Sequence, residues 1–119
     1  HLLVEEALTD ALIFKAENPK YIVEARLTFA NKYKMVRAFY DHSCESWIWT
    51  SISMLNKTRN RLAHNLSPQE VEEDINQFIL FVKNNQPMWV DGMLTVNHSN
   101  FFWAIFLIFS EIRSLTSIE

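Results

Sequence analysis

The sequence has 119 residues, a mass of 14.1 kDa and 49% hydrophobic residues, which suffices for one domain with a substantial core and argues against a disordered chain. One glycine and three prolines are too few for the frequent turns of an all-β protein, so an all-α fold with few loops is expected. The net charge of −3 is a poor match for a protein that binds nucleic acid without specificity.

The expected fold is an up-and-down bundle of about five helices, and residues 2–16 form the first of them. Asn18-Pro19 ends this helix, because proline disfavours the helical conformation in the residue before it. A second helix is predicted over residues 23–40, followed by a polar connector at residues 41–44. The third helix is predicted from about residue 45 to residue 64. No repeat or linker divides the chain, so residues 1–119 are expected to form a single domain.

An arginine interrupts the apolar pattern of the third helix. The apolar positions follow steps of four and three residues: Ile48, Ile52, Leu55 and Leu62. Arg59 occupies the position expected between Leu55 and Leu62. An arginine on a core-facing stripe has to extend to solvent, serve a site or pair with an acid, for which Glu72 and Asp74 of the next helix are candidates.

The start of the fourth helix carries a capping box. Ser67 is the predicted N-cap, Pro68 takes the first helical position, and Glu70 follows three residues after the serine. The helix is predicted to continue to about Asn84. Five of its apolar residues are expected to face the core: Val71, Ile75, Phe78, Ile79 and Val82.

Residues 85–97 are predicted to be non-helical, either as a plain loop or with a tight hairpin around Asp91-Gly92. The last helix is predicted over residues 99–117. It is apolar on most faces, which is typical of a central helix or of a helix at a subunit interface.

The segment from Leu55 to Asn65 ends the third helix with the pattern Arg59-Asn60-x-x-x-His64. This pattern, at the end of a helix and just before a second, capped helix, resembles the signature of the HEPN superfamily. Residues 27–32 also resemble the segment that precedes the motif in small single-domain members. The resemblance covers most of residues 1–84 and implies a HEPN-like helical domain.

The chemistry of the motif residues suits RNA cleavage without a metal ion or another cofactor. Arginine offers a planar fork of donors to a phosphate, and histidine can transfer a proton near neutral pH. On a helix Asn60 and His64 face the same side, whereas Arg59 lies about 140° round from His64. One phosphate could therefore touch all three only at the helix end, or if a second chain contributed its own copy. Arg59, Asn60 and His64 are the predicted catalytic residues, and the resemblance implies a site shared across a symmetric homodimer.

Positive charge is concentrated around this motif. Residues 26–65 carry seven lysines and arginines against Asp41 and Glu45, a balance of +5. Four of these basic residues are predicted to bind the RNA substrate: Lys32, Lys34, Lys57 and Arg61. Solvated helix faces are the simpler interpretation of this charge.

Two functions remain open at this point. The first is an RNA-cleaving toxin or defence component with an antitoxin as partner. The second is a non-catalytic regulatory or interaction protein, similar to the mannitol operon repressor family. A purely structural role of the motif is a further alternative, in which Arg59 pairs with an acid and His64 and Asn65 finish the helix by bonding its last carbonyls.

The remaining chemistry-bearing residues predict no further site. The four histidines are scattered without a carboxylate or thiol at ligand spacing, so no metal site is expected. Cys44 is expected to be an inert thiol, and the absence of a cysteine framework and of a leader predicts a cytoplasmic protein. The apolar run over residues 101–109 is far shorter than the roughly 20 residues that span a bilayer, so no membrane partner is expected. The tryptophans are expected in the core or at an interface: Trp47, Trp49, Trp89 and Trp103.

Overall fold

A computed structural model describes residues 2–64, 67–86, 89 and 99–116, and these ranges contain six α-helices, one short 3-10 helix and no strand. The helices are α1 (Leu2–Lys15), α2 (Lys20–Glu24), α3 (Phe29–Tyr40), α4 (Ser46–Leu62), α5 (Pro68–Asn85) and α6 (Ser99–Arg113), with η1 (Ser114–Thr116) as the 3-10 turn. The predicted all-helical class is therefore confirmed for the described residues. The hairpin or loop expected around Asp91-Gly92 lies outside them.

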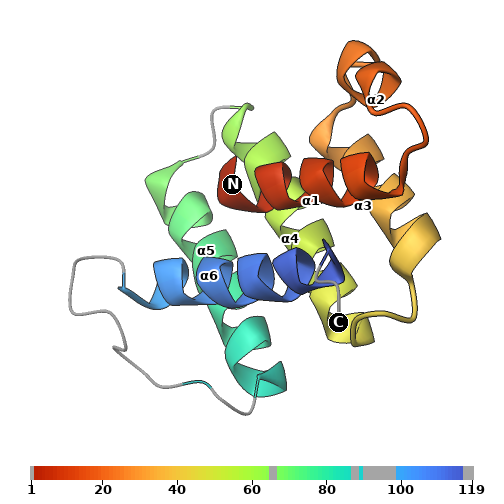
Figure 1. Cartoon of the computed structure of the whole chain (residues 1–119). Coiled ribbons are helices and arrows are strands. Elements are labelled where there is room, and N and C mark those ends of the chain that lie inside the picture. The colour runs from red at the N-terminus through yellow and green to blue at the C-terminus, as the bar shows by residue number, and fades with distance from the viewer. Residues whose placement is uncertain (1, 65–66, 87–88, 90–98, 117–119) are drawn as a thin grey trace.

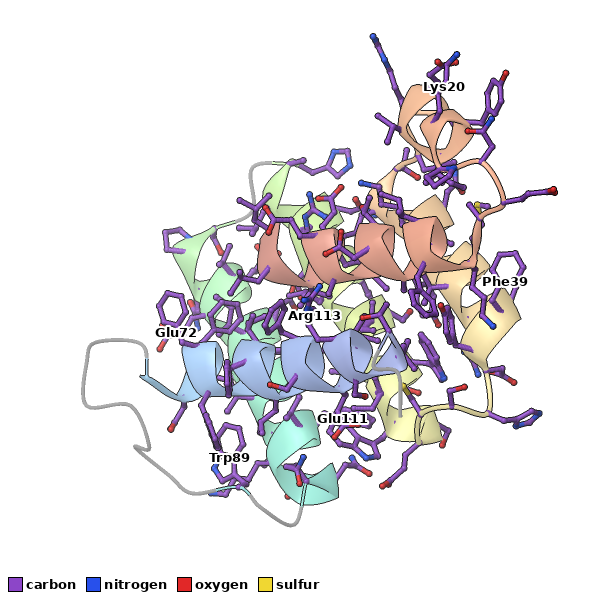
Figure 2. The ribbon with its side chains drawn as sticks, viewed as in Figure 1. Lys20, Phe39, Glu72, Trp89, Glu111 and Arg113 are labelled. Atoms are coloured by element: carbon purple, nitrogen blue, oxygen red, sulfur yellow. The ribbon has the colours of Figure 1, made fainter. Side chains whose placement is uncertain are left out.

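The helices pack as a bundle in which α1 and α6 lie side by side, and α6 crosses over α4 and α5 (Figure 1). α4 and α5 are adjacent and run in opposite directions, and α3 packs against both α1 and α4 (Figure 1). Arg113 at the end of α6 lies between α6 and α1 (Figure 2), and its Nη1 is 2.9 Å from Oδ2 of Asp10. No described helix is long and apolar enough to cross a membrane.

The core contains apolar side chains from α1, α3, α4, α5 and α6. The largest of those that are fully buried are Trp49, Phe78, Leu8, Leu12, Ile48, Ile52, Ile105, Ile108 and Ile112. Trp49 is fully buried and donates its indole N–H to the carbonyl of Asp41 at 3.1 Å, so the expectation of a core tryptophan is confirmed there. Tyr40 donates its hydroxyl to the carbonyl of Ala11 at 2.9 Å, and its burial raises the pKa of the phenol.

The predicted helix over residues 23–40 is wrong, because the structure divides this segment into α2 and α3. Arg26 has a positive φ of 48°, which no helix accommodates. Thr28 has an extended backbone, and its Oγ1 accepts a hydrogen bond from the backbone N–H of Asn31 at 3.1 Å. Thr28 is therefore the N-cap of α3. The hydrogen bond of the Thr28 side chain stabilises a helix start at this residue, which the spacing of the apolar residues did not predict.

The buried stripe of α4 also differs from the expected one. It continues from Leu55 to Thr58, whereas Leu62 is 48% exposed. Because an α-helix has 3.6 residues per turn, a step of three from Leu55 keeps Thr58 on the buried face and turns Arg59 outward. Arg59 therefore does not replace a core residue, and the last turn of α4 leaves the core.

The predicted N-cap of α5 is confirmed at Ser67, while the Glu70 carboxylate accepts a hydrogen bond from the Ser67 hydroxyl at 3.1 Å. Ser67 is extended and accepts the amide of Glu70 on its Oγ at 3.3 Å, and Pro68 occupies the first turn. Phe78 and Val82 are buried, as the apolar pattern of this helix predicted.

Removal of this cap provides a test of the local stability of α5. We expect Ser67→Ala to lower the free energy of unfolding by about 1 kcal/mol, because one amide of the first turn loses its acceptor. Urea denaturation monitored by circular dichroism measures this change. Ser114→Ala is the control, because Ser114 follows α6 and its hydroxyl bonds the local carbonyl of Glu111. Equal midpoints for Ser67→Ala and the parent chain would contradict the assigned role of the cap.

Candidate functional site

The last turns of α4 and the first turn of α3 form a groove. Its lining residues are Thr28, Phe29, Ala30, Asn56, Arg59, Asn60 and Ala63. Two of the three predicted catalytic residues, Arg59 and Asn60, therefore line the same groove. The small side chains of Ala30 and Ala63 leave it open between the two helices. The α3 residues and Asn56 were missed by the sequence interpretation, and the Thr28 N-cap is the signal that could have located the start of α3.

Arg59 is held by two contacts that the sequence did not predict. Its Nη2 lies 3.5 Å from Oε1 of Glu5 in α1, and its guanidinium carbon lies 4.7 Å from the centre of the Phe29 ring. The Arg59 side chain remains 40% exposed. The guanidinium therefore has a defined position and still offers donors to a ligand in the groove.

Glu5 also binds a second cation. Its Oε2 accepts a hydrogen bond from Nζ of Lys32 at 3.0 Å, and the Lys32 side chain is only 18% exposed. Lys32, a predicted substrate-binding residue, is thus paired with an acid of its own chain. The Glu5 carboxylate joins α1 to both helices that form the groove.

The start of α3 adds donors to the same groove. The first N–H groups of an α-helix have no carbonyl partner within the helix, and they form the positive end of the helix dipole. Thr28 caps the amide of Asn31, while Phe29 and Ala30 of the first turn line the groove. Arg59, Asn60 and the first turn of α3 therefore border one space, and arginine, asparagine and a helix N-terminus all carry N–H donors that suit an anion.

His64 lies outside the helix in which the sequence placed it. α4 ends at Leu62, the amide of Ala63 bonds the carbonyl of Arg59 at 3.3 Å, and the amide of His64 bonds the carbonyl of Arg61 at 3.0 Å. The expectation that Asn60 and His64 share a helical face assumed a helix that continues to residue 64, whereas α4 ends at Leu62 with Ala63 as its C-cap. His64 is exposed and does not line the groove, but it directly follows the lining residue Ala63.

Arg61 faces the opposite side of α4. Its Nε lies 3.2 Å from Oδ2 of Asp74, and its Nη2 lies 3.6 Å from Oε2 of Glu70, both in α5. Oδ2 of Asp74 is buried without a hydrogen bond, so the contact with Arg61 is an ion pair of poor hydrogen-bond geometry. The pairing with Asp74 that the sequence suggested for Arg59 is thus made by Arg61, which lies two residues and about 200° further round the helix.

The predicted substrate-binding residues therefore do not form one patch. Lys32 lies beside the groove, whereas Lys57 and Arg61 line a separate depression between α4 and α5. Lys34 and Lys57 are exposed, and neither forms an ion pair within the described part of the chain. Of the four predicted substrate-binding residues, Lys34 and Lys57 are therefore the two without an ion pair among the described residues.

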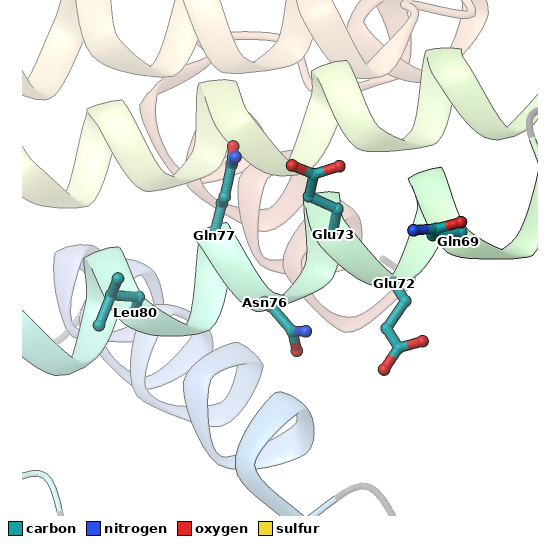
Figure 3. Close-up of a pocket in the computed structure, with 6 residues that line it drawn as sticks. All are labelled: Gln69, Glu72, Glu73, Asn76, Gln77 and Leu80. Atoms are coloured by element: carbon teal, nitrogen blue, oxygen red, sulfur yellow. The ribbon is translucent and has the colours of Figure 1, made fainter.

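A further depression lies along the outer face of α5. All its lining residues come from this one helix: Gln69, Glu72, Glu73, Asn76, Gln77 and Leu80 (Figure 3). Glu72 and Glu73 give it negative charge, so it is unsuited to a phosphate. In the described ranges, no group of three or more histidine, cysteine, aspartate or glutamate side chains could hold a metal ion.

Comparison of the chain with protein-family models, with curated proteins and with solved structures found no match. The candidate site therefore rests on the residues and their geometry.

Cys44 provides a test of the expectation of an inert thiol. Burial, with a smaller contribution from the charge of Glu111, raises the pKa of Cys44 to about 11. Because the thiolate is the nucleophile, we expect alkylation by iodoacetamide at pH 8 to be about 100-fold slower in the native than in the unfolded protein. Mass spectrometry over time measures both rates. Equal native and unfolded rates would show that this thiol is neither shielded nor held neutral.

Proposed function

We propose that this chain is a HEPN-like, metal-independent endoribonuclease that acts as a homodimer. Its biological role would be that of a toxin or defence component, with an antitoxin as partner. The observation that carries the proposal is the groove between α3 and α4. There Arg59, Asn60 and the first turn of α3 line one space, and all three carry N–H donors. A phosphodiester of RNA is an anion whose oxygens fit such donors.

In the proposed reaction the 2′-hydroxyl of the RNA attacks the adjacent phosphorus and the bond to the 5′-oxygen breaks. The products are a 2′,3′-cyclic phosphate and a 5′-hydroxyl. His64 accepts the proton of the attacking hydroxyl or gives a proton to the leaving oxygen. Arg59 and Asn60 stabilise the additional negative charge on the phosphorane oxygens. The reaction uses both a general base and a general acid, and one His64 fills only one of these roles. Another group therefore has to fill the second role.

A second copy of the chain provides that group in the proposed dimer. His64 is exposed and Leu62, in the last turn of α4, is 48% exposed, so both can contact another subunit beside the groove. On α6, Phe102 and Phe106 are 42% and 48% exposed. Phe102 and Phe106 are four residues apart and share one side of α6, so a second copy that packed there would bury both rings.

The dimer leads to a separate prediction. At tens of micromolar we expect light scattering to give twice the 14.1 kDa mass of the chain. Leu62→Asp should shift this mass towards the monomer, because a charge in an apolar interface loses its hydration without a partner. Leu80→Asp is the matched control, since Leu80 is 55% exposed on the outer face of α5 (Figure 3). A monomeric parent chain at this concentration would contradict the shared site.

Cleavage of labelled RNA by the purified protein in the presence of a metal chelator tests the proposed reaction. We expect fragments that end in a 2′,3′-cyclic phosphate, which mass spectrometry identifies by the loss of one water relative to an open phosphate. Intact RNA after prolonged incubation with the dimeric protein would rule out the nuclease.

A non-catalytic regulatory protein, similar to the mannitol operon repressor family, is the second candidate. The observation in its favour is the pairing of three basic residues with acids of the same chain. Lys32 and Arg59 contact Glu5, and Arg61 contacts Glu70 and Asp74. These pairs reduce the positive charge available to RNA. A protein that neither cleaves nor binds RNA, yet forms a stable dimer, would favour this second function.

A further inference from the structure

The carboxylate of Glu5 connects three helices at the candidate site. Its Oε1 is 3.5 Å from Nη2 of Arg59 on α4, and its Oε2 is 3.0 Å from Nζ of Lys32 on α3. The Glu5 side chain is 24% exposed, and α1, on which it lies, packs against α3. The contact between Glu5 and Lys32 is close and well shielded, so the carboxylate itself has a defined position.

This anchored carboxylate restricts the guanidinium of Arg59. An arginine at a helix end has several rotamers, and a single aromatic contact does not select one of them. Here the Phe29 ring, 4.7 Å away, restrains one face of the guanidinium, and Glu5 attracts one of its edges. The remaining donors are the ones available to a ligand in the groove. Side chains held by such supporting contacts lose less entropy when they bind.

We propose that Glu5 is the positioning residue of the site: it holds Arg59 so that the free edge of the guanidinium meets the phosphate. This inference rests on the proposed function for its kinetic consequence, though the Arg59 geometry can be measured without RNA. Glu5 has a second effect of opposite sign, because its negative charge opposes the binding of an anion. Its removal should therefore affect binding and turnover in opposite directions.

The variant Glu5→Gln separates these effects because it removes the charge and retains the size. We expect kcat to fall between about 10-fold and 100-fold, as misplacement of a catalytic group by about 1 Å costs rates of this order. We expect KM for RNA to stay constant or to fall, because the groove becomes more positive. A loss of stability alone would not lower kcat while leaving KM constant or reduced. An unchanged kcat, or a raised KM with constant kcat, would overturn the proposal.

Two variants on α1 serve as controls. Glu6→Gln makes the same charge change at the next position, which is exposed and forms no ion pair within the described residues. Asp10→Asn removes an acid that pairs with Arg113 on α6 at 2.9 Å. Both should keep the kcat of the parent chain. A loss in either of them as large as in Glu5→Gln would show that the effect comes from net charge or from the stability of α1.

Nuclear magnetic resonance of the Arg59 side chain gives a result that does not depend on activity. The Phe29 ring should shift the δ and ε protons of Arg59 upfield in the parent chain, and Arg59→Lys identifies these signals by their loss. In Glu5→Gln they should move towards the positions of a mobile arginine, and in Glu6→Gln they should not. Unchanged signals in Glu5→Gln would overturn the positioning role. Uncleaved RNA with displaced signals would instead refute the nuclease and retain Glu5 as the residue that positions Arg59.

Discussion

Replacement of His64 by alanine is expected to lower the kcat of RNA cleavage by about 10²- to 10⁴-fold, the usual contribution of one general acid or base. His64 is exposed beyond the end of α4, so its loss removes the proposed proton-transfer group without opening the core. Arg59→Ala is expected to lower kcat by about 10²- to 10³-fold, because the phosphorane loses a preorganised cation. Initial rates with a fluorescent RNA and chelator measure both effects.

The controls for these variants lie on or just after α3, at positions outside the groove. His42→Ala removes another exposed histidine, which follows the end of α3 that is opposite the groove. Arg37→Ala removes an arginine that pairs with Asp41 at 2.9 Å. Both should cleave RNA at the parental rate. If His64→Ala and Arg59→Ala also did so, any cleavage would come from another site or from a contaminating enzyme.

Replacement of Trp49 by alanine is expected to lower the free energy of unfolding by about 3 to 5 kcal/mol, the range for the loss of a large buried aromatic side chain. Trp49 is fully buried, its ring centre is 6.4 Å from that of Tyr33, and its indole N–H bonds the carbonyl of Asp41. The variant therefore leaves a cavity between α3 and α4 and an unsatisfied carbonyl. Guanidinium denaturation followed by far-UV circular dichroism measures the loss.

Trp47→Ala is the control for this loss, because Trp47 lies on the same helix, two residues before Trp49. Trp47 is half-buried, and its indole N–H bonds the exposed carboxylate of Glu45 at 3.1 Å. Trp47→Ala should lower the free energy of unfolding by less than half as much as Trp49→Ala does, since less apolar surface returns to water. Equal losses in the two variants would contradict the central place of Trp49 in the core.

The sequence by itself determined the features that depend on local chemistry. The sequence has too few turn-forming residues for an all-β fold, which predicted a helical chain. The elements of the described residues are all helices. Ser67, Pro68 and Glu70 predicted the start of α5 to the residue, because a cap and its partners lie within one turn. Arg59 and Asn60 were identified from a motif that resembles the HEPN signature, and both line one groove.

Tertiary structure alone decided which residues surround Arg59. Neither Glu5 nor Phe29 has a sequence signal that relates it to Arg59, because ion pairs and ring contacts between helices depend on how the helices pack. The same packing turned Arg61 rather than Arg59 towards Asp74. Helical periodicity gives the relative angle of two side chains on one helix, but the neighbour that each meets depends on the orientation of the whole helix in the bundle. The partners of the motif were therefore accessible only from the folded chain.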